Sequence, residues 1–306
     1  MGLDSGLTLH RLLTDFPVLA ASLRGAERAA LSDAPVLVLG EPGTGRSTLA
    51  RALHDASQRA ASPRVEVDPG AVPSSLFESE LFGYRAGAFT GAATASPGRV
   101  ARAAGGSLVL DHVEELPLAA QPKLLRLLAE RTYTPLGGAE AVADVRFIAL
   151  ACEELPERVA RGAFRADLFY RLEVLAFRLP PLRERRADLP AVLAFLLADL
   201  GERFARPGLS LAPAARDWIQ EHQWPGNLRE LRNVLERSLI LTGAGPLDPP
   251  PPDGAPGGRP CSLAEVEKRQ ILAALAYTRG HQGRAALLLG ISRKALWEKR
   301  RRYGIP

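Results

Sequence analysis

Short apolar runs recur between residues 35 and 179 and alternate with stretches in which Leu and Ala follow helical spacing. Each run is four to six residues long, and three of the runs are rich in Val or Ile. Uninterrupted apolar runs of this length predict parallel strands that are buried on both faces of an α/β sheet. The five predicted strands are Pro35–Leu39, Arg64–Val67, Ser107–Leu110, Val145–Leu150 and Val174–Leu179.

Helical spacing predicts helices at Thr48–Ala60 and Gln121–Glu130, between the strands. The strand pattern ends at Pro180 and Pro181. Three further helices are predicted to form a small helical subdomain: Leu189–Phe204, Pro213–His222 and Asn227–Thr242.

The segment Leu247–Pro260 contains four consecutive prolines and several glycines, which predicts a semi-rigid or disordered linker. Three more helices are predicted after it, at Ser262–Thr278, Gly283–Leu289 and Ser292–Tyr303. The predicted organisation is an α/β core at residues 1–180, a helical subdomain at 181–245, a linker at 246–261 and an all-α domain at 262–306.

The composition is that of an ordinary globular protein, with 46% apolar and 24% charged residues. No apolar run approaches the ~20 residues that a membrane helix requires, and the N-terminus does not resemble a signal peptide. We therefore expect a cytoplasmic protein without a membrane partner. Cys152 and Cys261 lie far apart and lack metal-type spacing, which argues against a disulfide or a zinc site.

Positive charge is concentrated near the C-terminus. From Cys261 to Pro306 the chain has ten Lys or Arg and three acidic residues, a net charge of +7, whereas the whole chain has +5. The remainder therefore carries about −2. A small basic segment attached to a nearly neutral body predicts a nucleic-acid-binding module.

A glycine-rich segment follows the first predicted strand and precedes a predicted helix. In this context backbone N–H groups can surround phosphates at a helix N-terminus. The alternative is an ordinary strand-to-helix turn. The segment departs from the phosphate-loop pattern at Arg46, where the pattern has Lys, and it consists of Gly40, Glu41, Pro42, Gly43, Thr44, Gly45, Arg46 and Ser47.

A second glycine-containing segment follows the acidic and apolar stretch Glu78–Gly83. Its glycines and small residues favour neither helix nor strand, so we expect a mobile loop that presents one aromatic side chain. Taken alone, it could be a surface turn. In this setting it resembles the loop by which sigma-54-dependent transcription activators, a branch of the AAA+ ATPases, contact their sigma factor. The loop consists of Gly87, Ala88, Phe89, Thr90, Gly91 and Ala92.

The resemblance runs from about Ser32 to Ile305 and implies a fold: an AAA+ P-loop parallel sheet, a helical lid and a C-terminal helix-turn-helix domain. It also implies ATP and Mg²⁺ as cofactors. Ser107–Asp111 resembles the acidic strand of these ATPases, so Asp111 and Ser47 are the candidate Mg²⁺ ligands. The residues expected to bind ATP are the phosphate loop from Gly40 to Ser47 together with Thr48, Asp111 and Arg229.

Four positions at the γ-phosphate end of this site depart from the family pattern. Arg46 replaces Lys, and His112 replaces the Glu that activates water. Asp68 stands where the family has Asn, and Ala151-Cys152 stands where it has Thr-Asn. Together these changes predict impaired hydrolysis, with Asp111 and His112 as the remaining candidate catalytic residues. Glu114 or Glu115 could substitute for the missing Glu only by reaching back toward the strand.

The parts that act on a neighbouring subunit match the family. Phe164–Leu172 resembles the segment that lends Arg165 and Arg171 to the neighbour's nucleotide. Leu179–Arg185 resembles the family hinge, and Trp224–Leu231 resembles the lid signature, in which Arg229 points back at the phosphates. Surface salt bridges are the alternative role for each of these arginines.

The C-terminal segment Arg284–Tyr303 resembles a Fis-type helix-turn-helix. Its second helix would enter the major groove of double-stranded DNA at enhancer sites, and its later basic residues would contact phosphates. Trp297 could belong to the core or face DNA, and the basic run could be a solvated helix face. Glu265–Tyr277 could form a dimer seam. The expected DNA-contacting residues are Arg284, Ser292, Arg293, Lys294, Trp297, Lys299 and Arg300.

Three functions fit these features. The first is a DNA-bound activator that forms a ring and acts on sigma-54 RNA polymerase through Gly87–Ala92. The second is a hydrolysis-deficient modulator or repressor that joins a mixed ring with an active paralogue. The third is a helix-turn-helix factor whose AAA+ part only oligomerises. Since about thirty residues before the first strand are too few for a sensing domain, we expect any regulator to act in trans.

Overall fold

The chain forms two compact units, Met1–Pro250 and Pro251–Pro306. The computed structural model describes residues 7–241, 245–251 and 281–303, together with the single positions 267, 270, 271, 274, 275 and 278.

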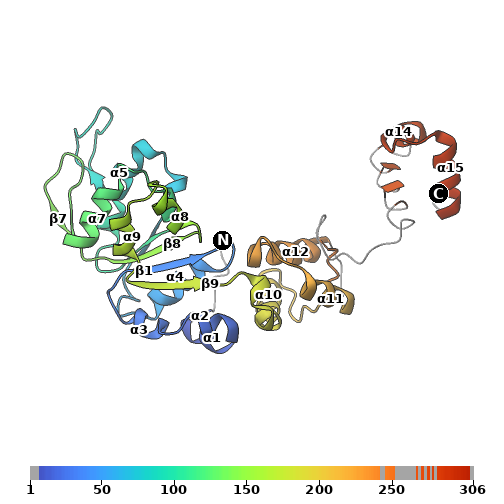
Figure 1. Ribbon diagram of the computed structural model, residues 1–306, viewed down its shortest axis with the longest axis horizontal. Coiled ribbons are helices and arrows are strands. Elements are labelled where there is room, and N and C mark those ends of the chain that lie inside the picture. The colour runs from blue at the N-terminus through green and yellow to red at the C-terminus, as the bar shows by residue number, and fades with distance from the viewer. Residues whose placement is uncertain are drawn as a thin grey trace. The chain divides into compact units, whose positions relative to one another are not determined.

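A five-stranded parallel sheet forms the centre of the first unit, with the strand order β2-β5-β8-β1-β9 (Figure 1). Val38 of β1 lies opposite Leu150 of β8 on one side and Phe177 of β9 on the other. All five predicted strands are confirmed to within one residue. Their bounds are β1 Val36–Gly40, β2 Arg64–Val67, β5 Ser107–Leu110, β8 Arg146–Ala151 and β9 Leu175–Leu179.

Helices cover both faces of this sheet, which explains the uninterrupted apolar runs (Figure 1). Val36 and Val38 of β1 pack into one apolar cluster, and Leu37 and Leu39 pack into the other. The first cluster includes residues of the helical subdomain, and the core helices that contribute to it are α1 Leu9–Thr14, α2 Pro17–Ser22, α3 Ala26–Ala30 and α4 Arg46–Asp55. Those of the second are α5 Ser74–Phe82, α6 Arg99–Arg102, α7 Gln121–Glu130, α8 Leu155–Ala160 and α9 Ala166–Leu172.

Helix α4 begins and ends earlier than the predicted Thr48–Ala60. It starts at Arg46, inside the glycine-rich segment, and ends at Asp55. The Ser57 backbone N–H and hydroxyl both donate to the carbonyl of His54, at 3.0 and 2.6 Å. Hydroxyl side chains that bond to nearby backbone groups compete with helix continuation, so the predicted C-terminal end was wrong.

Arg146 at the start of β8 is fully buried and joins the sheet to two helix ends. Its guanidinium donates to the carbonyls of Ala29 at 2.7 Å, Ala30 at 2.9 Å and Leu53 at 3.3 Å. Burial lowers the pKa of Arg146. Carbonyls at the C-terminal ends of α3 and α4 carry partial negative charge, which favours a cation at this position.

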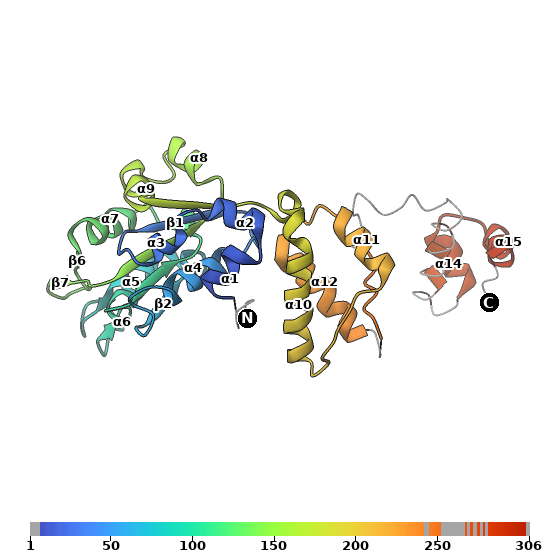
Figure 2. The same ribbon diagram turned by 90° about the horizontal axis from the view of Figure 1, so that it is seen from below.

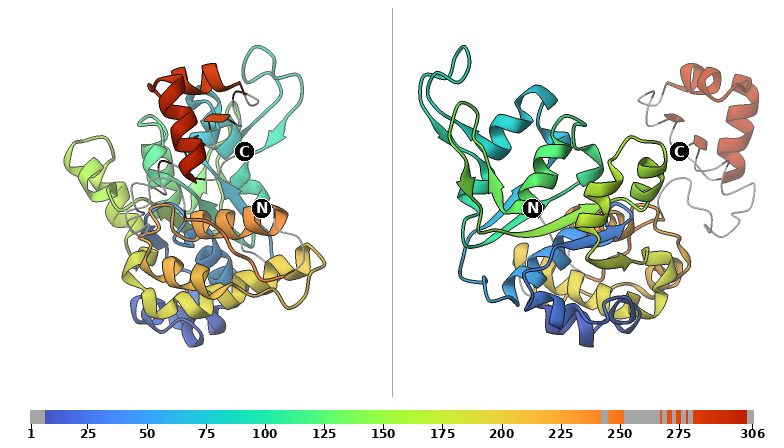
Figure 3. Two further views of the ribbon diagram at one scale, coloured as in Figure 1. Left: turned by 90° about the vertical axis from the view of Figure 1, so that its right-hand side faces the viewer. Right: turned by 60° about the vertical axis from the view of Figure 1, so that its left-hand side comes forward.

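Two short hairpins extend from the second face, at the upper left of the right-hand view in Figure 3. Strand β3 (Gly83–Tyr84) pairs with β4 (Ser96–Pro97), and β6 (Thr132–Tyr133) pairs with β7 (Ala141–Val142). A bridge between Tyr84 and Leu136 connects the two hairpins. The segment Gly87–Ala92 therefore lies at the tip of a hairpin that is held at its base.

The helical subdomain follows β9 through two short 3-10 turns, η3 (Leu182–Glu184) and η4 (Arg186–Asp188). The three predicted helices are confirmed, and α10 and α12 run side by side (Figure 2). Asp188 connects this region to the core, since its carboxylate accepts the backbone N–H groups of Val18 and Leu19 at 2.9 Å. The helices are α10 Leu189–Arg203, α11 Pro213–Glu221 and α12 Asn227–Leu241.

The second unit contains α14 (Gln282–Leu288) and α15 (Arg293–Tyr303), which correspond to two predicted helices. Its small core is made of Ile271, Ala274, Ala285, Ala286 and Leu296. Most of the predicted helix Ser262–Thr278, including most of the suggested dimer seam Glu265–Tyr277, lies outside the described residues, as does most of the predicted linker. Within the described part of the chain, no helix has the length and apolar character needed to cross a membrane.

Replacing Arg146 with Leu should lower the free energy of unfolding by about 3 kcal/mol, because the carbonyls of Ala29, Ala30 and Leu53 lose their hydrogen bonds from the buried guanidinium. The midpoint of urea denaturation measures the change. Arg161→Leu is the matched control, since the Arg161 side chain is 76% exposed and pairs with Glu157 at the surface. We expect less than about 0.5 kcal/mol from the control. Equal effects of the two variants would contradict the role of Arg146.

Candidate nucleotide site

The glycine-rich segment connects the end of β1 at Gly40 to the start of α4 at Arg46. Gly43 and Gly45 have φ angles of +81° and +107°, a left-handed conformation that glycine adopts most easily. The backbone therefore curves around the N-terminus of α4, where unpaired N–H groups favour an anion.

A cavity of about 370 Å³ lies beside this loop and brings together most of the predicted nucleotide residues. Its basic side chains predominate over two acidic ones, so it suits phosphate. Predicted residues that line it are Gly43, Gly45, Arg46, Ser47, Thr48, Asp111, His112 and Arg229. The cavity is also lined by residues that the sequence did not predict: Arg51, Arg64, Glu66, Leu228 and Arg232.

Arg46 is folded back into the loop that carries it. Its side chain is only 7% exposed, and Nη1 donates to the carbonyl of Gly40 at 3.0 Å. Nη2 lies 3.9 Å from Oδ1 of Asp111. The guanidinium therefore places positive charge between the phosphate loop and the acidic strand.

His112 and Asp68 contact each other at the edge of the phosphate cavity. His112 Nδ1 lies 3.3 Å from Oδ2 of Asp68, whose other oxygen accepts the N–H of Gly70 at 2.9 Å. His112 has a φ of +49°, and its backbone N–H donates to Asp111 Oδ1 at 2.9 Å. Two of the four unusual positions thus form one paired unit.

Glu114 and Glu115, which follow His112 closely in the chain, both contact other residues. Glu114 is buried, and its Oε1 accepts the N–H of Cys152 at 3.2 Å. Glu115 pairs with Arg158 at 2.8 Å. Burial, with Glu114 nearby, raises the pKa of the Cys152 thiol to about 12. Neither glutamate lines the phosphate cavity.

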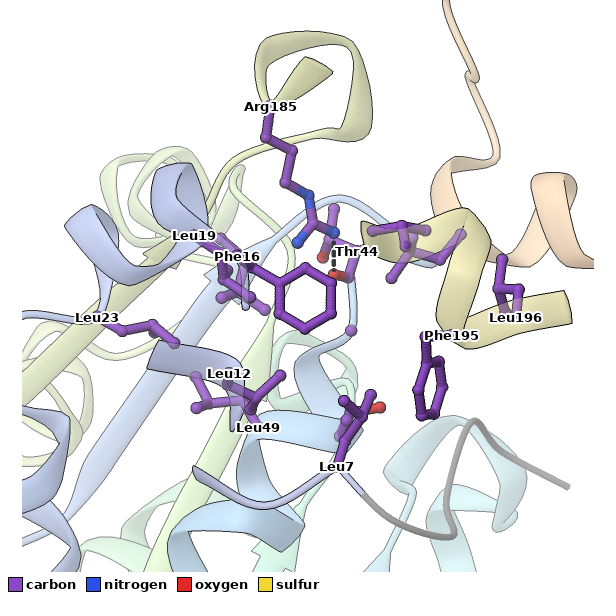
Figure 4. Close-up of a pocket in the computed structure, with 15 residues that line it drawn as sticks. Leu7, Leu12, Phe16, Leu19, Leu23, Thr44, Leu49, Arg185, Phe195 and Leu196 are labelled. Carbon is purple, nitrogen blue, oxygen red and sulfur yellow. Dashed lines mark hydrogen bonds between the residues drawn. The ribbon is translucent and has the colours of Figure 1, made fainter. Parts of the chain in front are cut away.

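An apolar cavity of about 40 Å³ adjoins the phosphate cavity (Figure 4). The two share Gly45, Thr48 and Leu228. A basic cavity beside an apolar one suits the chemistry of a nucleotide's phosphates and base, and the apolar cavity must widen to hold a base. The apolar walls come from α1 and α2, the phosphate loop with α4, and α10, through Leu12, Phe16, Leu19, Thr44, Leu49, Val192, Phe195 and Leu196.

The lid is fixed to the phosphate loop by Asn227, the first residue of α12. Its Nδ2 donates to Glu41 Oε2 and to the carbonyl of Pro42, both at 3.1 Å, and its Oδ1 accepts the N–H of Leu182 at 2.7 Å. Arg183 completes the network with two bonds to Glu41 at 2.6 and 2.9 Å. The bond from Arg183 lowers the pKa of Glu41.

Arg165 and Arg171 lie outside the phosphate cavity of their own chain. Arg165 pairs with Asp167 at 2.7 Å, and both side chains are nearly half exposed. Arg171, in α9, donates to the carbonyl of Leu128 at 3.5 Å. Both arginines belong to a segment whose Tyr170 is 70% exposed.

The hairpin tip is closed by its own backbone. The N–H of Gly87 donates to the carbonyl of Ala92 at 2.8 Å, and Gly91 has a φ of +103°. Phe89 is 41% exposed, and its ring packs edge-on against Tyr84 with 5.0 Å between centroids. The tip thus presents an aromatic side chain on a defined turn.

In the second unit, Ser292 begins the turn into α15, and its hydroxyl accepts the N–H of Ala295 at 3.1 Å. Trp297 is 53% exposed, with Arg301 over its ring, and therefore does not belong to the small core. Lys299 pairs with Glu267. The side chains of Arg284, Arg293 and Lys294 are exposed, whereas Arg300 is half-buried.

The chain matches the family described as the Sigma-54 interaction domain over residues 12–178. It belongs to the sigma-54-dependent transcriptional regulators. The match starts before Ser32, so the family resemblance also includes most of the N-terminal helices. Residues 183–249 match the AAA+ ATPase lid domain, and residues 262–303 match the bacterial regulatory proteins of the Fis family.

Several regulators of this family are similar to the chain. The regulatory protein AtoC of Escherichia coli K12 is 41% identical over 313 residues, 96% of this chain and 68% of AtoC. The alginate biosynthesis transcriptional regulatory protein AlgB of Pseudomonas aeruginosa is 41% identical over 299 residues, 94% of this chain and 66% of AlgB. The chain thus spans about two thirds of these relatives.

Among solved structures, NtrX from Brucella abortus in complex with ATP is similar in fold, with a TM-score of 0.71. Its sequence is 31% identical, and the similarity covers 99% of this chain and 70% of NtrX. NtrX in complex with ADP gives a TM-score of 0.70.

Replacing Asn227 with Gly should lower the free energy of unfolding by about 2 kcal/mol, because the change removes the amide and keeps the backbone φ of +52° accessible. Asn227→Ala should cost about 1 kcal/mol more, since a side chain with Cβ is strained in this conformation. Denaturant midpoints measure both. Asn233→Ala, at an exposed position of the same helix, is the control and should change stability little. If Asn227→Gly behaved like this control, the network would not hold the lid.

Proposed function

We propose that the chain is an ATP-binding and DNA-binding regulator that acts on sigma-54 RNA polymerase through the loop Gly87–Ala92. The observation that supports this most directly is the exposed Phe89 on a hairpin that is closed at its tip and paired at its base. An aromatic side chain held in this way offers a ready contact for a partner protein.

Nucleotide binding is supported by the basic cavity beside the phosphate loop. Arg46 and Arg229 would pair with phosphate oxygens, and the backbone of Gly43–Gly45 would surround them. Ser47 and Asp111 line the same cavity and supply a hydroxyl and a carboxylate, which fit Mg²⁺. The metal, when bound, neutralises charge on the phosphates. The ATP complex of NtrX agrees with this assignment.

We infer that hydrolysis is weak. The family's water-activating Glu is replaced by His112, which contacts Asp68 instead. Arg46 keeps its charge but is fixed to the Gly40 carbonyl, and a planar guanidinium does not reproduce the point contact of a Lys ammonium. Glu114 Oε1 accepts from Cys152, Glu115 pairs with Arg158, and neither residue lines the phosphate cavity, so they are poor substitutes.

A second function is favoured by where these changes fall. All four alter the chain's own γ-phosphate end, whereas Arg165 and Arg171, which would act on a neighbour, are present. Such a subunit could complete an active paralogue's site in a mixed ring while contributing little turnover of its own. It would then modulate or repress rather than activate.

The second unit would bring the regulator to double-stranded DNA in the cytoplasm. Arg284, Ser292, Arg293, Lys294 and Trp297 would face the groove, and the basic residues at the end of α15 would contact phosphates. In the leading proposal, copies of the chain assemble from dimers into a ring with ATP between subunits.

The unaltered protein should bind ATP and hydrolyse it slowly. The contact between His112 and Asp68 adds a condition for restoring hydrolysis. If only position 112 were changed to Glu, the new carboxylate would face the Asp68 carboxylate. We therefore expect the triple change Arg46→Lys, Asp68→Asn and His112→Glu to raise turnover at least tenfold, and more than the double change that keeps Asp68. Phosphate release at high protein concentration, with Mg²⁺ and enhancer DNA, measures this.

The matched control has Arg46→Lys, Asp68→Asn and His112→Gln. It differs from the triple variant only in lacking a carboxylate base at position 112. It should stay as slow as the unaltered protein. Brisk hydrolysis by the unaltered protein would disprove the impaired-site proposal.

Phe89→Ala should abolish transcription from a sigma-54 promoter, because the loop loses its exposed aromatic contact. ATP and DNA binding should persist, since Phe89 lies outside the phosphate cavity and outside the second unit. In vitro transcription measures activation, and titrations with ATP and with enhancer DNA measure the two binding properties. Leu118→Ala changes another exposed apolar residue and serves as the control. A full transcriptional response by Phe89→Ala would rule out the loop contact.

A further inference from the structure

Arg185, at the hinge between core and lid, is a buried cation beside the apolar cavity. The residue is 1% exposed, and its Nη2 donates to the carbonyl of Thr44 at 2.7 Å. Figure 4 shows its side chain running from the hinge to Thr44, next to the Phe16 ring. Its Nε has no hydrogen-bond partner among the described residues.

The nearby acid does not satisfy this guanidinium. Asp188 acts on Arg185 only through its charge, since both Asp188 oxygens accept the N–H groups of Val18 and Leu19. Burial lowers the pKa of Arg185 to about 10. A buried donor without a partner costs free energy, and a ligand that supplies an acceptor recovers it.

The cavity offers a base few other polar partners. Of the described residues that line it, only Thr44, Thr48 and Arg185 have polar side chains. The Thr44 hydroxyl already donates to the carbonyl of Glu41 at 2.8 Å. The cavity of about 40 Å³ corresponds to a few water molecules, so the apolar side chains must repack around a purine. A purine buried there carries ring nitrogens that need donors.

We propose that Arg185 reads the base of the bound nucleotide by donating from its guanidinium to a ring nitrogen of a purine. This inference rests on the proposed nucleotide site, because the phosphate cavity and the apolar cavity share the lining residues Gly45, Thr48 and Leu228. It assigns to Arg185 a specificity role beyond its bond to Thr44.

The test compares ATP with its 1-deaza, 3-deaza and 7-deaza analogues, each of which has a CH group in place of one ring nitrogen. Dissociation constants are measured by calorimetry on the full chain with Mg²⁺. At least one analogue should bind tenfold or more weakly than ATP, because Arg185 then keeps a buried donor without an acceptor. In Arg185→Met, which removes the donors and keeps an unbranched apolar stem, that ratio should fall below about threefold.

Two results would overturn the assignment: all three analogues binding the unaltered protein as well as ATP does, or the ratio persisting in Arg185→Met. If the Met variant does not fold, Arg185→Lys provides the comparison. Lys keeps the cation but has a shorter reach, so it should narrow the ratio, and an unchanged ratio counts against the proposal.

Inorganic tripolyphosphate separates this inference from the function on which it rests. ATP should bind the unaltered protein more tightly than tripolyphosphate does. If the two bind equally, the base is not read, and the inference fails while the phosphate site stands. If neither binds, the proposed nucleotide site fails, and the role of Arg185 fails with it.

Discussion

The position of the lid depends on one amide group at the start of α12. Asn227 contacts the phosphate loop with its nitrogen and the hinge with its oxygen, in a left-handed conformation that presents both atoms at once. The neighbouring residue adds a backbone bond, from the N–H of Leu228 to the carbonyl of Gly43 at 3.0 Å. Leu228 and Arg229 follow Asn227 directly, so the same contact positions both of them. Leu228 lines both cavities, and Arg229 brings its guanidinium into the lining of the phosphate cavity.

Buried arginines stabilise this fold in a second, recurrent way. Arg46, Arg146 and Arg185 each donate to main-chain carbonyls: of Gly40, of two helix ends, and of Thr44. A guanidinium has five donors in a fixed plane, so it can satisfy carbonyls that helices and turns leave unpaired. In an α/β core with many strand-to-helix connections, such carbonyls are frequent. The cost of burying charge is offset only where the carbonyls are close, which explains why these side chains are so precisely placed.

Much of the core was predictable because its signals are local. The strands follow from apolar runs such as Val36–Gly40, and the phosphate loop from glycines between a strand and a helix. The two-residue strands of the hairpins carry no such pattern, since pairing alone defines them. The apolar cavity could not be predicted, because Phe16, Leu49 and Val192 come from distant segments and each has the pattern of an ordinary core residue. The ion pair between Glu41 and Arg183 joins positions 142 residues apart, and no spacing rule connects them.

The contact between Asp68 and His112 has an evolutionary consequence. A carboxylate and an imidazole lie 3.3 Å apart at this contact, so the imidazole can donate a hydrogen bond that the carboxylate accepts. A change of His112 alone to Glu would leave two carboxylates facing each other, whereas a change of Asp68 alone to Asn would leave an amide that can still hydrogen-bond to the imidazole. The order of the two changes therefore matters. A path that changes position 68 first avoids the pair of like charges.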